Sequence, residues 1–188
     1  MTVVRHLVVC TIAALGVCGS VAACGSDRSP DSTPVLATTV PTAFDPCHDV
    51  ASDSLDTMQL MRNPSPLDLR ADPDEPGVKA QGCQYLSAVT DENSPMTLLW
   101  VEATNLTVNA YRKFHNTQQE PIELAGHGAL TISDSTPSDT GPTRFSCTVL
   151  IDIPGGGIRF IGGSNRPDLC HLLENLADAT VSKLPSGS

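Results

Sequence analysis

Seven cysteines divide this chain of 188 residues into two parts, because three lie within the first 24 residues and four lie far beyond. The first part starts with the basic Arg5 and continues as an almost wholly apolar run from Leu7 to Ala23. A membrane-spanning helix needs about 20 apolar residues, and this Gly- and Ala-rich run is short for that purpose. A basic start, a short apolar core and a small-residue exit are typical of a secretory signal, so we expect the chain to be exported.

The end of the apolar run, Val21-Ala22-Ala23-Cys24, resembles the bacterial lipobox. The resemblance implies cleavage before Cys24, a diacylglyceryl thioether on its sulfur and acylation of its new amino group. Two or three acyl chains anchor a protein stably where one chain is marginal. We therefore expect a lipoprotein on the extracytoplasmic face of the cell membrane. The alternative is an ordinary signal that is cleaved after Ala23 and leaves Cys24 as a free thiol.

Removal of the predicted signal peptide, residues 1–23, leaves 165 residues (188 − 23), which is enough for one domain with one core. Residues 24–43 are rich in Ser, Thr and Pro, and we expect the lipidated cysteine and a disordered tether there. A single folded domain is predicted over residues 44–184, followed by a short tail over 185–188.

The predicted mature chain is strongly acidic. Loss of Arg5 leaves 10 basic residues (11 − 1) against 21 acidic ones, a formal charge of −11. Nucleic-acid binding needs a basic surface, so nucleic acid is excluded as a partner. The same charge argues against electrostatic docking on anionic lipid, so membrane attachment rests on the acyl anchor.

The four remaining cysteines are Cys47, Cys83, Cys147 and Cys170. An even number in an exported chain predicts two disulfides. No CxxC pair is present, which argues against a zinc site or a redox centre, and we expect no cofactor. Of the three possible connectivities we favour Cys47–Cys83 and Cys147–Cys170, because each pair joins a predicted helix to a nearby predicted strand. Each such bridge would contribute about 3–4 kcal/mol in the chain-entropy model.

Hydrophobic periodicity predicts an α+β fold. The clearest strand spans 144–153, where apolar residues from Phe145 to Ile153 alternate with mostly polar ones. Residues 63–81 and 134–143 are predicted as loops. The predicted elements are a helix over 46–62, strands over 82–88 and 96–104, a helix over 107–118, strands over 122–124, 130–133, 144–153 and 158–161, and a helix over 165–184. Hairpin-type links between these strands imply an antiparallel sheet flanked by helices.

Several motifs then carry a family resemblance. After the lipobox and tether, Phe44-Asp45-Pro46-Cys47 leads a helix, Gly82-Cys83 leads a strand and Gly126-His127-Gly128-Ala129 lies in the middle of the domain. In these features the chain resembles actinobacterial lipoproteins of domain-of-unknown-function family 3558 (DUF3558). The resemblance supports the cell-envelope location and the fold class, and it implies no mechanism. Other actinobacterial envelope lipoproteins and sensor domains have a PsbP-like sheet-and-helix fold, which is an analogue on fold-level grounds alone.

The histidines of the predicted mature chain are His48, His115, His127 and His171. They form no i,i+4 pair and no HExxH motif, so a metal site would have to assemble in space. His127 between two glycines could act as a base, but a tight turn explains those glycines more simply. We expect no catalytic residue and no metal ligand.

Two acidic groups are candidates for Ca²⁺, the helical stripe Asp45, Asp49, Asp53 and Asp56 and the loop Asp72-Pro73-Asp74-Glu75. Calcium takes its oxygen ligands from folded loops rather than from a helix face, and no EF-hand pattern is present. Solvated polar faces are therefore the favoured interpretation. The glycine-rich segments 155–157 and 162–163 lack the Lys-Ser/Thr of phosphate loops, and the chain contains no Gly-x-Ser-x-Gly elbow.

An anchor, a tether and a disulfide-bridged domain without a catalytic constellation predict a binding or interaction lipoprotein of the cell envelope with no enzymatic activity. Its ligand would be a lipid, a glycan or a protein, held against the sheet or by the loops 63–81 and 134–143. One alternative is an accessory subunit that modulates a membrane protein through the acidic region 45–75. Another is a cell-envelope hydrolase, which requires a Ser or His cluster in one concave pocket.

Overall fold

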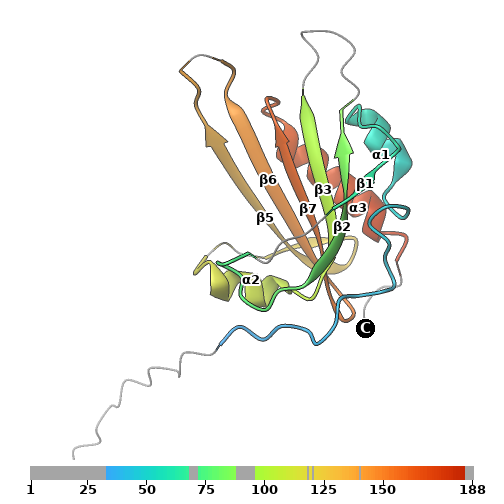
Figure 1. The fold of residues 1–188 in the computed structure, drawn as a ribbon, viewed down its shortest axis with the longest axis vertical. Helices are drawn as coiled ribbons and strands as arrows, with labels where there is room; N and C mark the ends of the chain where they lie inside the picture. Colours follow the sequence, from blue (N-terminus) through green and yellow to red (C-terminus); the bar gives the residue numbers. More distant parts are fainter. Residues whose placement is uncertain are drawn as a thin grey trace, which may run out of the picture. The chain divides into compact units, whose positions relative to one another are not determined.

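A computed structural model describes residues 33–67, 72–87, 96–117, 119, 121–139 and 141–184. The strands are β1 (Ser65–Pro66), β2 (Ala80–Leu86), β3 (Thr97–Thr104), β4 (Ile122–Leu124), β5 (His127–Thr136), β6 (Arg144–Ile153) and β7 (Gly156–Ser164). The helices are α1 (Ser52–Thr57), α2 (Val108–Phe114) and α3 (Leu169–Val181). Neighbouring strands all pair antiparallel, in the order β1-β2-β3-β7-β6-β5-β4 (Figure 1). The predicted α+β fold with an antiparallel sheet is therefore confirmed.

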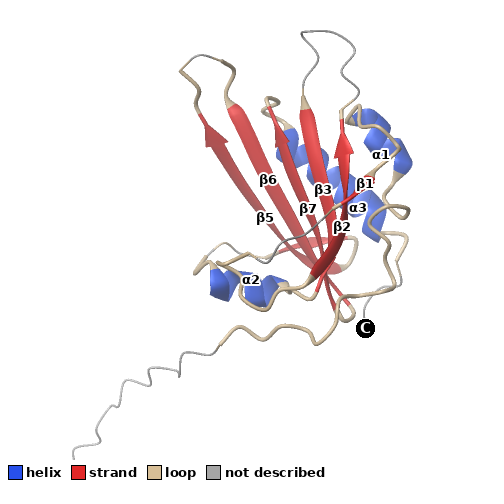
Figure 2. Ribbon diagram, viewed as in Figure 1, coloured by secondary structure: helices blue, strands red, loops and turns tan. Residues whose placement is uncertain are grey.

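Helix α3 covers one face of the sheet and forms the main core with it (Figure 2). Successive strand residues point to opposite faces, so alternate residues of β3, β6 and β7 reach this side. Val149 and Phe160 pack there beneath Leu173 and Leu176, and all four side chains are fully buried. Gly162 belongs to the same face, where an added Cβ would lie 2.8 Å from Leu173. The helix packs this closely because β7 has no side chain at that point.

The opposite face is covered at one end by α2 and by the chain segment before β2 (Figure 1). Leu106, Val108, Leu130 and Leu150 form a second, smaller buried cluster there. The side chain of Thr107 caps α2 by accepting the N–H of Ala110, as expected for threonine at this position. The rest of this face is exposed around Trp100.

Both favoured disulfides are present, Cys47–Cys83 and Cys147–Cys170, with Cα–Cα distances of 5.3 Å in each. The first ties β2 to the turn that precedes α1, and the second ties β6 to the first turn of α3. The predicted connectivity is thus confirmed, although Cys47 lies in a turn and only Cys170 lies in a helix.

The first helix is shorter than predicted, because it covers Ser52–Thr57 rather than 46–62. Asp45 accepts the N–H of Cys47 at 2.8 Å in the manner of an N-cap, but the chain only makes a turn there. Ala51 is extended, and Gln59 has a left-handed φ of 55°, which ends the helical run. A turn followed by one short helix thus presents the apolar spacing that predicted a continuous helix.

The first described residues also differ from the prediction, which placed a tether up to residue 43. The N–H of Ala37 donates to the carbonyl of Asn105 at 3.0 Å, and Leu36 and Val40 pack on the two apolar clusters. These residues associate with the domain because they bury apolar side chains. Residues 24–32 lie outside the described part of the chain.

The predicted loops 63–81 and 134–143 contain more structure than expected. β1 and the first two residues of β2 lie in the first predicted loop, and the last three residues of β5, 134–136, lie in the second. The strands predicted at 122–124 and 144–153 have the bounds of β4 and β6. No helix in the described ranges combines the length and the hydropathy of a membrane span.

Candidate functional site

Five apolar residues form an exposed surface on the sheet face opposite α3, and we call this surface the tryptophan face. Its members are Leu86, Met96, Leu98, Trp100 and Ile161. Trp100 is 36% exposed, Leu86 40% and Met96 69%. Leu98 and Ile161 are half-buried between them.

The strand register brings these residues together. Leu86 of β2 is paired with Leu98 of β3, and Trp100 of β3 is paired with Ile161 of β7. Directly paired residues place their side chains on the same face, about 4.5–5.5 Å apart at Cβ. Met96 precedes Leu98 by two positions, so the strand alternation continues onto it. The result is one contiguous patch across three strands.

The tryptophan face also contains one position without a side chain. Gly163 of β7 is paired with Leu98, and an added Cβ at this glycine would meet no atom within 4 Å. Contiguous apolar patches on a soluble domain are typical of interaction sites, whereas single exposed apolar residues are ordinary. The sequence of residues 96–100 already contains a signal for this patch. Met96, Leu98 and Trp100 recur at every second position and so share one face of β3, while Leu99 lies on the other face.

A buried ionic network borders the tryptophan face. Arg159 of β7 donates from Nη1 to both carboxylate oxygens of Glu75, at 2.8 and 3.1 Å, and from Nε to Glu102 at 2.8 Å. Both glutamates are nearly fully buried. His115 Nε2 lies 3.0 Å from Glu75, and the ring of Tyr111 stacks on that histidine at 4.2 Å between centroids. Burial, followed by the charge of Glu75, raises the pKa of the Tyr111 hydroxyl.

This network holds the segment before β2 against the sheet. Glu75 belongs to that segment, while its partners come from β7 and from the end of α2. The acidic loop that was a calcium candidate therefore supplies an internal ion pair rather than an open set of ligands. Sequence reasoning did not predict this network, because its partners are 84 and 40 positions apart.

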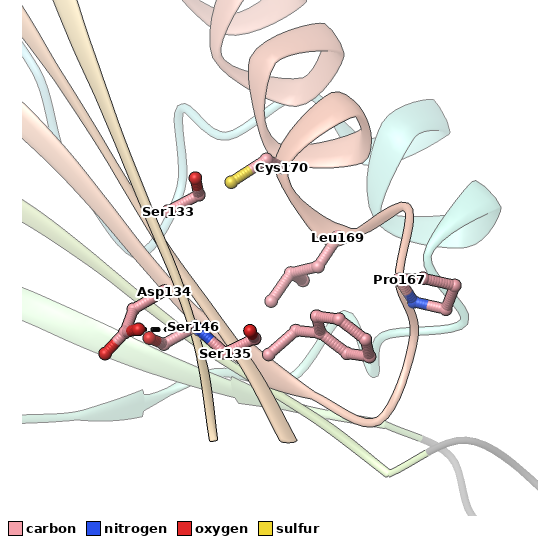
Figure 3. Close-up of a pocket in the computed structure, with 8 residues that line it drawn as sticks. Ser133, Asp134, Ser135, Ser146, Pro167, Leu169 and Cys170 are labelled. Atoms are coloured by element: carbon pink, nitrogen blue, oxygen red, sulfur yellow. Dashed lines mark hydrogen bonds between the residues drawn. The ribbon is translucent and has the colours of Figure 1, made fainter. Parts of the chain in front are cut away.

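A groove of about 400 Å³ lies between the end of β5 and the beginning of α3 (Figure 3). The residues that line it are Ser133, Asp134, Ser135, Phe145, Ser146, Pro167, Leu169 and Cys170. It combines three hydroxyls and one carboxylate with an apolar wall. None of these lining residues is a histidine or a lysine, and the one carboxylate, that of Asp134, accepts the backbone N–H of Ser135 with Oδ1.

The predicted histidines occupy separate places. His48 contacts Asp45 at 2.9 Å on the surface, and His171 accepts a hydrogen bond from the side-chain amide of Asn175. His127 is buried and donates from Nδ1 to the carbonyl of Asp152 at 3.1 Å. The left-handed Gly126 beside it, with φ of 80°, closes the β4–β5 hairpin as predicted, whereas Gly128 is paired with Glu123 within the sheet and is not part of the turn.

The acidic stripe does not form one helix face, because Asp45 and Asp49 lie in the turn before α1. Asp56 is paired with Arg62 on the surface. The N–H of Cys47 and then the His48 ring hold the pKa of Asp45 below its ordinary value. Within the described residues, no group of three or more His, Cys, Asp or Glu side chains could hold a metal ion. Cys24, the predicted lipidation site, lies outside those residues.

Fold and surface together define a small disulfide-bridged α+β domain with an exposed apolar sheet face. The model of the DUF3558 family, described as a protein of unknown function, matches residues 13–183. The chain belongs to this family, as its motifs predicted. Comparisons with curated proteins and with solved structures give no match, so the likeness to PsbP stays a prediction.

Proposed function

We propose that this chain is a lipid-anchored binding protein of the cell envelope, and that it docks a partner protein on the tryptophan face without catalysing a reaction. The observation that carries the proposal is the 36% exposure of Trp100 within a contiguous apolar patch. Tryptophan and methionine are enriched in protein interfaces, and tryptophan is frequent among the residues that dominate binding energy. Met96, 69% exposed at the border of the patch, can adapt its shape to a partner.

The shape of the patch favours a protein over a lipid or a small glycan. Sites for small ligands are concave and bury about 70–90% of the ligand surface. An exposed sheet face with an open position at Gly163 covers only one side of an acyl chain or sugar that lies on it. A protein partner supplies the second wall itself.

Two observations support a role without catalysis. The serine-bearing groove beside β5 has no histidine or lysine among its lining residues, and its one carboxylate, that of Asp134, accepts a backbone N–H. The buried carboxylates of Glu75 and Glu102 both form ion pairs with Arg159. The hydrolase alternative needs an activated nucleophile, and neither place offers one.

The anchor is proposed from the lipobox at Val21–Cys24. Replacement of Cys24 by alanine removes the thiol that would accept the lipid. We expect the Cys24→Ala protein to leave the membrane fraction and to lose incorporation of a labelled fatty acid. Retention of the label in Cys24→Ala would reject lipidation at this residue.

Photo-crosslinking from a photoreactive residue at position 98 in intact cells tests the docking surface. The matched control position is Asn175, which is exposed on α3 on the other side of the sheet. We expect a discrete protein adduct from position 98, none of that mass from position 175, and its loss in a Trp100→Ser background. Adducts of equal yield from both positions would reject the site. An adduct with a lipid or glycan would reject a protein ligand, and an adduct with a membrane transporter or channel would favour the accessory-subunit alternative.

A further inference from the structure

The outer edge of the sheet at β5 is paired over only part of its length. β4 pairs with Ala129, Gly128 and His127 alone, whereas β6 pairs with β5 as far as Thr136. Residues 130–136 therefore have a strand neighbour on one side, and the described part of the chain places no strand on the other. An edge of this kind exposes a row of backbone N–H and C=O groups.

The turn geometry fixes which backbone groups point outward. A two-residue hairpin joins Leu124 to His127, so the backbone groups of His127 and of every second residue after it point away from β6. Those residues include Thr131, Ser133 and Ser135. The side-chain amide of Gln119 donates to the carbonyl of Thr131, which agrees with this assignment.

Side chains close this edge at its two ends and leave its middle open. Gln119 occupies the Thr131 carbonyl, and Asp134 Oδ1 accepts the N–H of Ser135 at 2.7 Å. Ser133 lies between them, and no hydrogen bond to its outward N–H and C=O occurs among the described residues. Ser133 also lines the groove of Figure 3, whose apolar wall comes from Phe145, Pro167 and Leu169.

We propose that β5 binds an extended segment of another protein by strand addition, with Ser133 as the central pairing residue. The partner residue opposite Ser133 would exchange two backbone hydrogen bonds with it. The side chain of that residue points to the α3 face, as Ser133 does, and enters the groove over Phe145 and Leu169. An apolar side chain fits that wall.

Charge selects the flanking residues of the segment. The partner residues before and after the central one point to the opposite face, where Asp134 is exposed. Glu174 of α3 accepts the hydroxyl of Thr131 on the α3 face, so Asp134 is the acid that lies on the side of the flanking residues. The whole chain carries a formal charge of −10. The ligand is therefore an extended segment in which Lys or Arg residues flank one apolar residue, and the site is independent of the tryptophan face.

The test uses an acetylated seven-residue peptide, Thr-Val-Lys-Leu-Lys-Val-Thr-amide, titrated into the purified full-length protein. We expect binding that slows amide hydrogen exchange at Ser133. Ser133→Pro removes the outward N–H at an edge position where proline is tolerated. It should weaken binding by about tenfold or more, whereas the matched Ser133→Ala should bind as the natural protein does.

Two further arms keep the proposal open to rejection. A peptide with an N-methylated central leucine loses the N–H that pairs with Ser133, so it should bind about tenfold more weakly even if Ser133→Pro does not fold. A peptide with Glu in place of both Lys residues should bind more weakly at low salt than the Lys peptide does. Equal affinity for the natural and methylated peptides would overturn the proposal. A dimer that forms through β5, excludes the peptide and disappears in Ser133→Pro would also overturn it, in favour of pairing between two copies of this chain.

Discussion

The hydroxyl of Tyr85 donates a hydrogen bond of 2.7 Å to the backbone carbonyl of Pro46. The next residue, Cys47, forms the disulfide with Cys83, which lies two positions before Tyr85 on the same face of β2. A covalent bond and a buried hydrogen bond therefore fasten one turn of the chain to one strand. The turn contains Phe44-Asp45-Pro46-Cys47, so these residues serve to close the domain.

Replacement of Tyr85 by phenylalanine should destabilise the domain by about 1–2 kcal/mol. The substitution leaves the Pro46 carbonyl without its buried donor, and an unsatisfied buried group costs about that much free energy. Urea unfolding measures the change. Tyr111→Phe is the matched control, since its hydroxyl makes no hydrogen bond within the described residues, and an equal loss in both variants would contradict the assignment.

Removal of either disulfide should lower the unfolding free energy by about 3–4 kcal/mol, because the bridges close loops with sequence separations of 36 and 23 residues. The double variants Cys47→Ala/Cys83→Ala and Cys147→Ala/Cys170→Ala are compared by denaturant unfolding under oxidising conditions. Thiol labelling of the natural protein should find none of these four cysteines free, and labelling of any of them would reject the pairing.

Replacement of Arg159 by methionine should destabilise the domain by about 3–5 kcal/mol. It leaves Glu75 and Glu102 as buried carboxylates without their cation, and the cost of that arrangement exceeds the net value of the ion pair itself. The triple variant Arg159→Met/Glu75→Gln/Glu102→Gln removes the charges together and should recover much of the loss. Thermal unfolding distinguishes the two, and a triple variant no more stable than Arg159→Met would contradict the explanation.

Asp152 should make the stability depend on pH. Burial raises the pKa of its carboxyl above the ordinary 3.8, and the N–H of Val108, 2.7 Å from Oδ1, opposes this shift only in part. The folded state therefore holds this proton more tightly than the unfolded state does. The contribution of Asp152 to stability is full below the unfolded pKa and is lost as the pH rises through the folded pKa.

The variant Asp152→Asn keeps an oxygen acceptor and cannot ionise. We expect the unfolding free energy of the variant, relative to the natural protein, to rise between about pH 3 and about pH 7. Parallel denaturant titrations across this range measure the difference. A difference that stays constant with pH would show that the carboxyl is not perturbed.

Two glycines of β7 should differ in how much stability is lost when alanine replaces them. Gly156 has a φ of 152°, and an added Cβ would collide with the carbonyl of Thr104 and lie 3.0 Å from Pro41. Gly156→Ala should cost about 3 kcal/mol, whereas Gly163→Ala, with open space at its Cβ, should stay within about 0.5 kcal/mol. Circular dichroism melting curves of both variants provide the comparison.

Sequence patterns predicted the elements whose hydrogen bonds are local or whose alternation is strong. β6 has its predicted bounds because apolar residues recur at every second position over ten residues. The first helix was predicted too long, since spacing alone does not separate a continuous helix from a turn followed by a short helix on the same core. β1 was missed because two residues, one of them Pro66, carry no periodicity.

The sequence by itself determined the export signal prediction, the even number of cysteines, the acidic charge and the two-faced character of the strands, because each depends on residue types at short spacing. Only the tertiary structure decided which face of β3 stays open around Trp100, that Glu75 meets Arg159 across 84 positions, and that β4 stops short and leaves Ser133 at an edge. Strand alternation gives every strand two faces. Which face and which edge are covered depends on where segments distant in the sequence pack. That packing is set by the apolar surface that the whole chain buries on folding.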